Sequence, residues 1–443
     1  MERRHRTARA PHEVPQALHD EPTTGSQSRL LTPGFRAIVV AQVFSLLGIE
    51  ILQFVLPLHL LNLTGSGTLY GGVVAAGFVP YIALSPVGGV IADRTRKRGV
   101  MAALDAVLAL IMLGYLACSG SQHLVGITVF VLMVAFAAQA IYHPCVQSAL
   151  PLVVPTERIP QATAVANQVS MITGIGGPVI GGMVFGFFGL APIIVVAAVS
   201  FAISSALVLA FVRIPYEPPA RTEGVLRTAA GDIRDALHFL RTRPVLWQII
   251  AAATLINLFG SSFINIGTPY IVTESLGLSN QLMGIAQGAL AVGGLLGGAL
   301  VVFMPERFTV KATPRLVGLA AAGIGAVAVV LLVAGEPYVA FAGMLASYLW
   351  VMVCCMAASI LMTSHLQMET PDELTGKVMG LAMMFGNLAT PAGQIAYGAA
   401  FDLASPWFVA ALAAVATALV AVPMSRSFRR GEWPSRQRRV RGE

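Results

Sequence analysis

The chain has 443 residues, of which 56% are hydrophobic and only 11% are charged, and its formal net charge is +7. An ordinary soluble domain carries about 25% charged residues, so this composition excludes a set of soluble domains. The basic residues flank apolar runs and build no basic helix or aromatic platform, so the positive charge predicts contact with lipid headgroups and no nucleic-acid partner.

The chain opens with residues 1–33, which are polar, rich in arginine and without a short apolar core before a cleavage site. This segment is predicted to be a disordered cytosolic tail rather than a signal peptide. Twelve apolar runs follow, each long enough to cross a bilayer core of about 30 Å as a helix. The runs are 36–61, 70–92, 99–118, 124–147, 162–186, 191–212, 246–271, 281–304, 315–334, 338–362, 376–401 and 406–424.

The distribution of lysine and arginine predicts which loops face the cytoplasm. All 28 of these residues lie in or next to the two tails and every second loop, and the intervening loops contain none. Cationic loops are retained in the cytoplasm during insertion, so each loop is assigned to a side and both termini are predicted to be cytosolic. The chain is therefore predicted to be a multi-pass membrane protein.

The runs divide into two sets of six. The longest internal gap, 213–245, separates residues 34–212 from residues 246–425, and a basic tail, 426–443, ends the chain. The gap contains an amphipathic helix, which is predicted to lie on the cytosolic membrane surface or to be a solvated linker helix. Similar proline-containing segments follow the fourth and the tenth runs. We therefore predict an all-α fold of two pseudo-symmetric six-helix bundles with a substrate cavity between them.

The first run contains the acidic residue nearest the middle of the membrane. Glu50 follows Arg36 by fourteen residues, which is about 21 Å of helix. A helical wheel places Gln42, Ser45 and Gln53 with it on an arc of about 140°, which predicts a polar stripe on the wall of a cavity. A charge at this depth is costly, so Glu50 is predicted to bind protons or a cationic substrate. The alternative is a structural acid held by hydrogen bonds.

Polar residues in three further runs are candidates for the site. Asp105 lies about 10 Å into the third run, near its cytosolic end, where an ion pair with a loop arginine is favoured over gating or a proton path. Gln139 and His143 share one face of the fourth run, and Asn387 and Gln394 share one face of the eleventh. Both faces are predicted to line the cavity or to hydrogen-bond a neighbouring helix.

The loop after the second run carries a motif. Residues 89–98 resemble the cytosolic loop motif of the major facilitator superfamily, with Arg96 where that family usually has glycine. The resemblance implies that Asp93 accepts hydrogen bonds from the N-terminus of the eleventh span, so that the loop latches the cytosolic side. The members predicted for this gating latch are Gly89, Asp93, Arg94, Lys97, Arg98 and Asp105.

The fifth run is rich in glycine. Gly174, Gly177, Pro178 and Gly181 are predicted to share one helix face, which gives a smooth groove for helix packing. Together with Gly182, they are similar to the Gly-Pro-x-x-Gly-Gly signature of exporters and antiporters in the same superfamily. The direction of transport is implied by this resemblance alone.

A narrower resemblance covers most of the chain. Segments 143–162 and 371–378 look like the branch of the superfamily that includes enterobactin exporters and macrolide efflux pumps. The resemblance implies a monomer that transports its substrate outward, driven by the proton gradient. The fourth run has no arginine, so the arginine-bearing motif of many drug–proton antiporters is absent and their proton relay does not carry over.

These observations predict a secondary active transporter that exports amphipathic small molecules, drug-like or siderophore-like, by proton antiport with alternating access. The alternatives are a facilitator or importer of the same fold, including a lysophospholipid transporter, and a non-transporting membrane receptor or scaffold. No nucleophile–base pair, phosphate loop or metal-spaced cluster stands out, so no enzyme activity, cofactor or metal is expected. The expected partners are a small-molecule substrate and the lipid bilayer.

Overall fold

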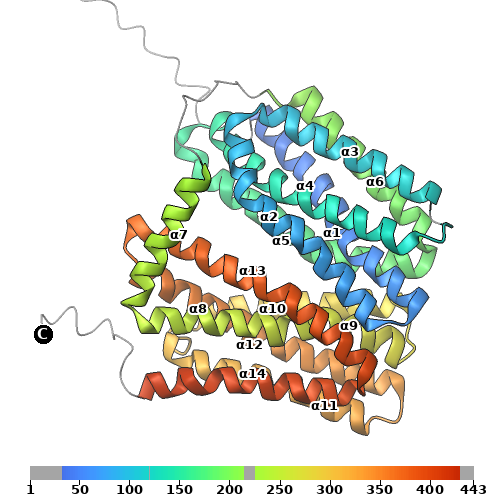
Figure 1. Ribbon diagram of the computed structural model, residues 1–443, viewed down its shortest axis with the longest axis vertical. Helices are drawn as coiled ribbons and strands as arrows, with labels where there is room; N and C mark the ends of the chain where they lie inside the picture. The colour runs from blue at the N-terminus through green and yellow to red at the C-terminus, as the bar shows by residue number, and fades with distance from the viewer. Residues whose placement is uncertain (1–31, 119, 214–224, 430–443) are drawn as a thin grey trace, which may run out of the picture.

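The structure is a computed structural model that describes residues 32–118, 120–213 and 225–429 (Figure 1). The predicted tails, 1–33 and 426–443, lie mostly outside these ranges, as does the first part of the predicted linker. Every regular element in the described ranges is helical.

Six long helices form the N-terminal group. They are α1 (Pro33–Thr64), α2 (Gly67–Arg94), α3 (Lys97–Cys118), α4 (Leu124–Val153), α5 (Ile159–Phe188) and α6 (Leu190–Phe211), with a short 3₁₀ turn at Thr156–Arg158. Thr32 and Ser66 cap α1 and α2, because each side chain accepts a hydrogen bond from a backbone N–H of the first turn. Gly65 ends α1 in the left-handed region at φ 65°, which lets the chain turn directly into α2.

The helices after the linker form the C-terminal group. They are α8 (Pro244–Ile256), α9 (Ser262–Pro269), α10 (Asn280–Phe303), α11 (Thr313–Val333), α12 (Pro337–Glu369), α13 (Asp372–Leu403) and α14 (Pro406–Arg429). α8 and α9 continue one another through a π-helical turn at Asn257–Ser261, and a second π turn, Tyr270–Ser275, extends α9. A 3₁₀ turn, Val310–Ala312, precedes α11. Such π turns interrupt the regular hydrogen bonding of a long helix and are frequent at functional sites.

The linker helix α7 (Val225–Arg241) packs against the C-terminal group. Ala236 and Leu240 are buried in the same apolar cluster as residues of α8 and α12. Asp235 lies 2.7 Å from the ammonium of Lys377 on α13. The hydrogen bond from this ammonium lowers the pKa of the Asp235 carboxyl. Neighbouring helices thus cover the part of the apolar face around Ala236 and Leu240, and Ile233 is 38% exposed.

Among the described residues, eleven helices are long and apolar enough to cross a membrane. α13 is not among them, although it is 32 residues long. Asn387, Thr390 and Gln394 lie in its central part and lower its hydropathy. The predicted count of twelve crossings is therefore not confirmed.

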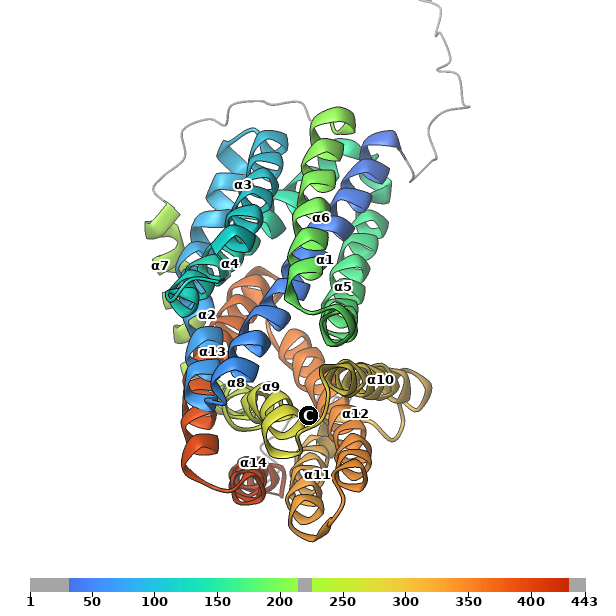
Figure 2. The same cartoon turned by 90° about the vertical axis from the view of Figure 1, so that its right-hand side faces the viewer.

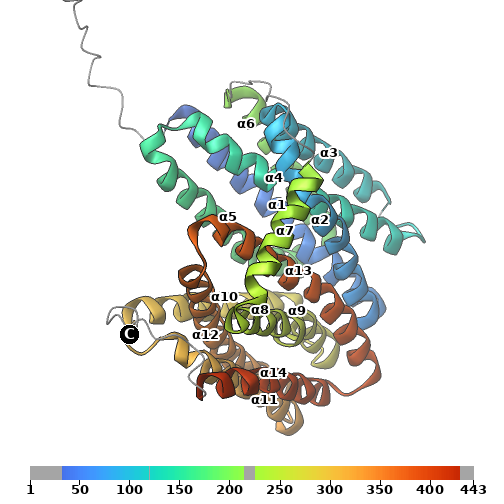
Figure 3. The same ribbon diagram turned by 60° about the vertical axis from the view of Figure 1, so that its left-hand side comes forward.

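The two groups of helices converge at one end of the molecule and diverge toward α7 at the other (Figure 1). Loops without lysine or arginine lie at the converging end, and the arginine-bearing loops lie at the diverging end. Figure 3 shows α7 crossing this diverging side toward α8. At the converging end α2 lies beside α13, and α5 lies beside α10 (Figure 2).

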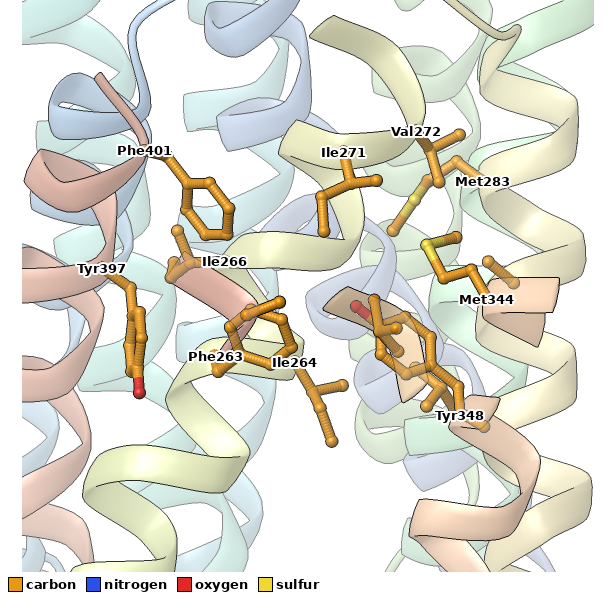
Figure 4. Close-up of a cluster of buried hydrophobic side chains, with 14 of the residues drawn as sticks. Phe263, Ile264, Ile266, Ile271, Val272, Met283, Met344, Tyr348, Tyr397 and Phe401 are labelled. Carbon is orange, nitrogen blue, oxygen red and sulfur yellow. The ribbon is translucent and has the colours of Figure 1, made fainter. Parts of the chain in front are cut away.

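An apolar cluster fills the C-terminal group near the converging end. Phe401 and Tyr397 of α13 lie beside Phe263 of α9, and Tyr348 of α12 faces the same interior (Figure 4). Residues of α1, among them Val55, belong to the same cluster. The apolar core is therefore continuous across the two groups at this end.

Candidate functional site

The converging end is closed by helices whose backbones approach closely. A methyl group added at Gly67 of α2 would lie 2.7 Å from the Gly398 carbonyl of α13, and one at Gly71 would overlap the Gln394 carbonyl. One added at Gly182 of α5 would lie 2.9 Å from the α-carbon of Gly284 on α10. Small residues at such crossings permit close packing of membrane helices. Glycine thus permits the two close contacts between the groups, the seam of α2 with α13 and the seam of α5 with α10.

Asp402 joins the two groups at the converging end. It is the penultimate residue of α13, and its carboxylate accepts hydrogen bonds from the first backbone amides of α2, Gly67 at 2.6 Å and Thr68 at 2.8 Å. The Ser66 hydroxyl donates a third at 3.0 Å. The N-terminus of a helix favours a carboxylate through its free amides and its dipole. The sequence analysis missed this contact, although an acid in a loop free of cations was a visible signal.

Glu50 lies in a polar cluster at the contact of α1 and α4. The Gln139 amide donates to Glu50 Oε1 at 3.3 Å, and the Gln53 amide donates to Gln139 at 2.9 Å. The side chain is half-buried, and no described lysine, arginine or histidine forms an ion pair with it. Behind it, Gly177 of α5 packs directly on its β-carbon. The structure therefore brings together three of the predicted site residues, Glu50, Gln53 and Gln139.

An aromatic group lies beside this cluster. Phe136 is one turn before Gln139 on α4, and its ring centroid is 5.0 Å from that of Phe78 and 6.5 Å from that of Tyr81 on α2. Tyr81 is half-buried and within electrostatic range of Glu50. Aromatic faces and a carboxylate together can bind an organic cation.

The other half of the predicted polar stripe lies elsewhere. Gln42 is buried between α1 and α5, where its amide donates to the Ala166 carbonyl at 3.1 Å and to Ser170 Oγ at 3.2 Å. Ser45 is also buried, and its hydroxyl donates to Asp105 at 2.7 Å. The prediction that these two residues line a cavity wall is wrong, because α1 is surrounded by other helices on this part of its length.

Asp105 is fully buried in the N-terminal group. Its carboxyl oxygens lie 2.7 Å from the Ser45 hydroxyl of α1 and 2.6 Å from the Ser204 hydroxyl of α6. No described cation forms an ion pair with it, so the expected pairing with a loop arginine is not present. The guanidinium of Arg98, the nearest arginine on the same helix, instead donates to the Leu209 carbonyl of α6.

A cavity of about 460 Å³ lies between α5 and the C-terminal group. Gly174 and Pro178 line it on one side, and Asn265, Gln287 and Met356 line it on the other. A second cavity of about 200 Å³ shares Asn257, Ser261, Met352, Cys355 and Met356 with the first. The described lining of both contains no Asp, Glu, Lys, Arg or His. Amides, hydroxyls and methionines in such a lining suit a neutral or amphipathic organic molecule.

The glycine signature of α5 does not form one packing face. Gly177 and Gly181 pack on α1, Gly182 packs on α10, and Gly174 and Pro178 line the cavity. The predicted groove for one packing partner is therefore not present, because different neighbours cover adjacent parts of this face.

The loop motif lies at the diverging end. Arg94 ends α2, Lys97 begins α3, and the side chain of Asp93 lies outside what the structure describes. A methyl group at Gly89 would meet no atom within 4 Å, whereas one at Gly88 would overlap the Ala140 carbonyl of α4. Gly89, a predicted member of the latch, therefore packs closely against no described neighbour in this conformation.

The remaining predicted residues do not join one site. His143 is exposed on α4 and Asn387 is exposed on α13. Gln394 is buried at the seam of α13 with α2, where its side-chain oxygen has no described hydrogen-bond partner. Asn387 and Gln394 therefore occupy different surroundings on the same helix.

Known proteins resemble this chain in sequence and in fold. Macrolide efflux protein A of Streptococcus pyogenes is 24% identical over 407 residues, which cover 89% of this chain and 96% of that protein. The enterobactin exporter EntS of Salmonella typhimurium is 24% identical over 352 residues, which cover 79% and 81%. A bacterial homologue of the iron transporter ferroportin, solved in an inward-facing state, has a TM-score of 0.69 at 16% identity, covering 90% of this chain and 100% of that one.

The family model of the Major Facilitator Superfamily matches residues 38–394. This range includes Glu50, the contact of Gly182 with Gly284, and both cavities apart from the α14 side of the smaller one. The chain therefore belongs to the Major Facilitator Superfamily, as a multi-pass membrane transporter and not an enzyme.

Proposed function

We propose that this protein exports amphipathic small molecules, drug-like or siderophore-like, across the bacterial inner membrane by proton antiport. The observation that carries the proposal is Glu50, a half-buried carboxylate that accepts a hydrogen bond from the Gln139 amide and has no ion-pair partner among the described residues. Such a group binds a proton or a cation and releases it at little structural cost. The efflux relatives support the outward direction.

The cavity supports the class of substrate. Its methionines adapt to varied apolar shapes, and its amides offer hydrogen bonds without demanding a charge. The carboxylate lies in the N-terminal group and the neutral lining lies mostly in the C-terminal group. We therefore assign proton exchange to the first group and substrate contact chiefly to the second.

Alternating access follows from the two ends of the molecule. If the arginine-bearing loops are cytosolic, the diverging end faces the cytoplasm and this conformation receives substrate from inside. In the opposite state, Asp93 near the end of α2 caps the N-terminus of α13. That contact mirrors Asp402, which caps α2 from the end of α13 in this state. One pair of helices thus supplies the latch on each side.

Everted membrane vesicles test the function. Acidifying the lumen should drive a substrate into vesicles that contain the wild type, and an uncoupler should abolish the uptake. Glu50→Gln should reduce this gradient-driven uptake and retain its fold. Glu336→Gln, in a loop at the converging end, is the matched control and should transport normally. Equal proton-driven uptake by Glu50→Gln and wild type would reject the role of Glu50.

The choice of substrate and of direction is tested separately. A panel of drugs and siderophores in a strain lacking its own pumps should reveal compounds whose retention falls when the protein is expressed. Counterflow that is unaffected by a pH gradient would favour the facilitator instead.

A further inference from the structure

The Asp105 cluster joins three helices in the N-terminal group. Asp105 of α3 is 0% exposed. Its Oδ1 lies 2.7 Å from Ser45 Oγ, and its Oδ2 lies 2.6 Å from Ser204 Oγ. Ser204 Oγ also lies 2.9 Å from the backbone carbonyl of Ala41. These three short contacts connect four oxygen-bearing groups inside the bundle.

The three contacts can all be hydrogen bonds only when Asp105 is protonated. A serine hydroxyl has one proton to donate, and the Ala41 carbonyl can only accept. If Ser45 donates to Asp105 and Ser204 donates to Ala41, the contact between Ser204 and Asp105 needs a third proton. A protonated Asp105 supplies it, by donating from Oδ2 to Ser204. An ionised Asp105 leaves one of the three contacts without a proton.

The surroundings also favour the neutral form. α6 contains no ionisable side chain. The ionisable residues of α1 are Arg36, Glu50 and His59, and none of them is at the level of Ser45, which contacts Asp105. α4 contributes Cys145 and the buried Tyr142, which lies within electrostatic range of Asp105, and neither residue carries a positive charge. An ion of this kind inside a membrane bundle is costly without a partner.

A polar route connects this cluster with α5. Ser45 is one helical turn from Gln42, whose amide donates to Ser170 Oγ at 3.2 Å. Ser170 is half-buried, and Gln42 Oε1 is buried without a described partner, so it can accept from a water molecule or a proton donor. We place the exchange of a proton with water on this side of the cluster.

We propose that Asp105 is a second proton-binding site, occupied in this conformation and emptied during the transport cycle. The inference rests on the proposed proton antiport and adds one proton to its stoichiometry. On binding, a proton from water attaches to Oδ2, and Ser204 turns its own proton to Ala41. On release, Ser204 turns back to donate to the carboxylate. Asp105 is therefore assigned to proton coupling rather than to the cytosolic latch.

Proteoliposomes that contain the full chain test the stoichiometry. With the membrane potential clamped at zero, each coupled proton multiplies the limiting substrate gradient about tenfold per pH unit. We expect about 100-fold for the wild type and about tenfold for Asp105→Asn, whose side chain is neutral and of the same shape. An unchanged limiting gradient in Asp105→Asn would overturn the inference. If the wild type builds no gradient at all, the proposed antiport itself fails.

Infrared spectroscopy tests the proton without any transport. At neutral pH the wild type should show the C=O stretch of a protonated carboxylic acid, and Asp105→Asn should lack that band. Ser204→Ala should shift the band, because it removes the acceptor of the proton. Ser205→Ala is the matched control, since that buried hydroxyl donates to Ala102 at 2.9 Å and should leave the band unchanged. Identical spectra for wild type and Asp105→Asn would show that Asp105 is ionised and merely structural.

Discussion

Removing the Asp402 carboxylate should open the converging end of the molecule. In Asp402→Ala, the backbone amides of Gly67 and Thr68 lose acceptors at 2.6 and 2.8 Å, and the Ser66 hydroxyl loses one at 3.0 Å. The contact exists only while α2 and α13 are together at this end. Its loss therefore destabilises this conformation relative to the opposite one.

The size of the effect follows from ordinary capping energies. Deleting an N-cap acceptor costs about 0.5–2 kcal/mol, and the charge of an acid near the helix dipole contributes about 0.3–1 kcal/mol. Asp402 is exposed, so solvent screening keeps the total near 1–2 kcal/mol. This corresponds to a change of roughly 5–30-fold in the ratio of the two states. Asp402→Asn keeps an acceptor and loses the charge, so it should shift the ratio less.

Distances between paired spin labels measure this ratio. Phe187 and Val333 lie near the converging end of the two groups and are 69% and 74% exposed, so Phe187→Cys and Val333→Cys in a background without native cysteines accept labels readily. The long-distance population should grow in Asp402→Ala and less so in Asp402→Asn. Glu336→Gln, which alters an acid whose side chain makes no capping hydrogen bond, should match the parent. An Asp402→Ala distribution equal to the parent's would refute the reasoning.

Three further changes test other parts of the structure. Gly71→Ala places a methyl group against the α13 backbone, so it should separate α2 from α13 and slow turnover. Gly72→Ala is the control and should turn over normally, because its added methyl group meets no atom within 4 Å. Equal substrate fluxes through the two variants would contradict this prediction. Met356→Ala removes part of the cavity lining and should raise KM for bulky substrates about tenfold. The number of protons exchanged per substrate should stay the same. A change in that number would contradict the assignment of proton exchange and substrate contact to different groups of helices. Leu240→Ser should lower the unfolding temperature, because it removes a buried apolar side chain between α7 and the C-terminal group. Asp235→Ala should leave the unfolding temperature nearly unchanged, because a surface ion pair contributes less than about 1 kcal/mol.

Sequence patterns predicted what depends on hydropathy. The long apolar runs correspond to helices because lipid requires every backbone group to bond within its own segment. α13 is also a long helix, but it is not apolar enough to count among the candidate membrane spans, because Asn387, Thr390 and Gln394 lower its hydropathy. The overall family was also predictable, because its motifs are local in sequence.

The site was only partly predictable. A helical wheel shows which residues of one helix share a side, but it does not show which other helices pack against that side. Glu50 and Gln53 meet Gln139 as expected, but Gln42 and Ser45 face the interior of the bundle. The α5 glycines split among three surroundings for the same reason. Asp402 was missed because its partners lie more than 300 residues away.

The neutral cavity lining has a consequence for how such a protein changes over time. The residues that we propose to contact the substrate lie mainly in one half, and the acids that we propose to exchange protons lie in the other. Mutations in the lining can therefore retune which compounds leave the cell while the machinery that powers departure stays intact. Under the proposed export, substitutions among these methionines and amides would change the range of compounds that leave the cell without changing the driving force.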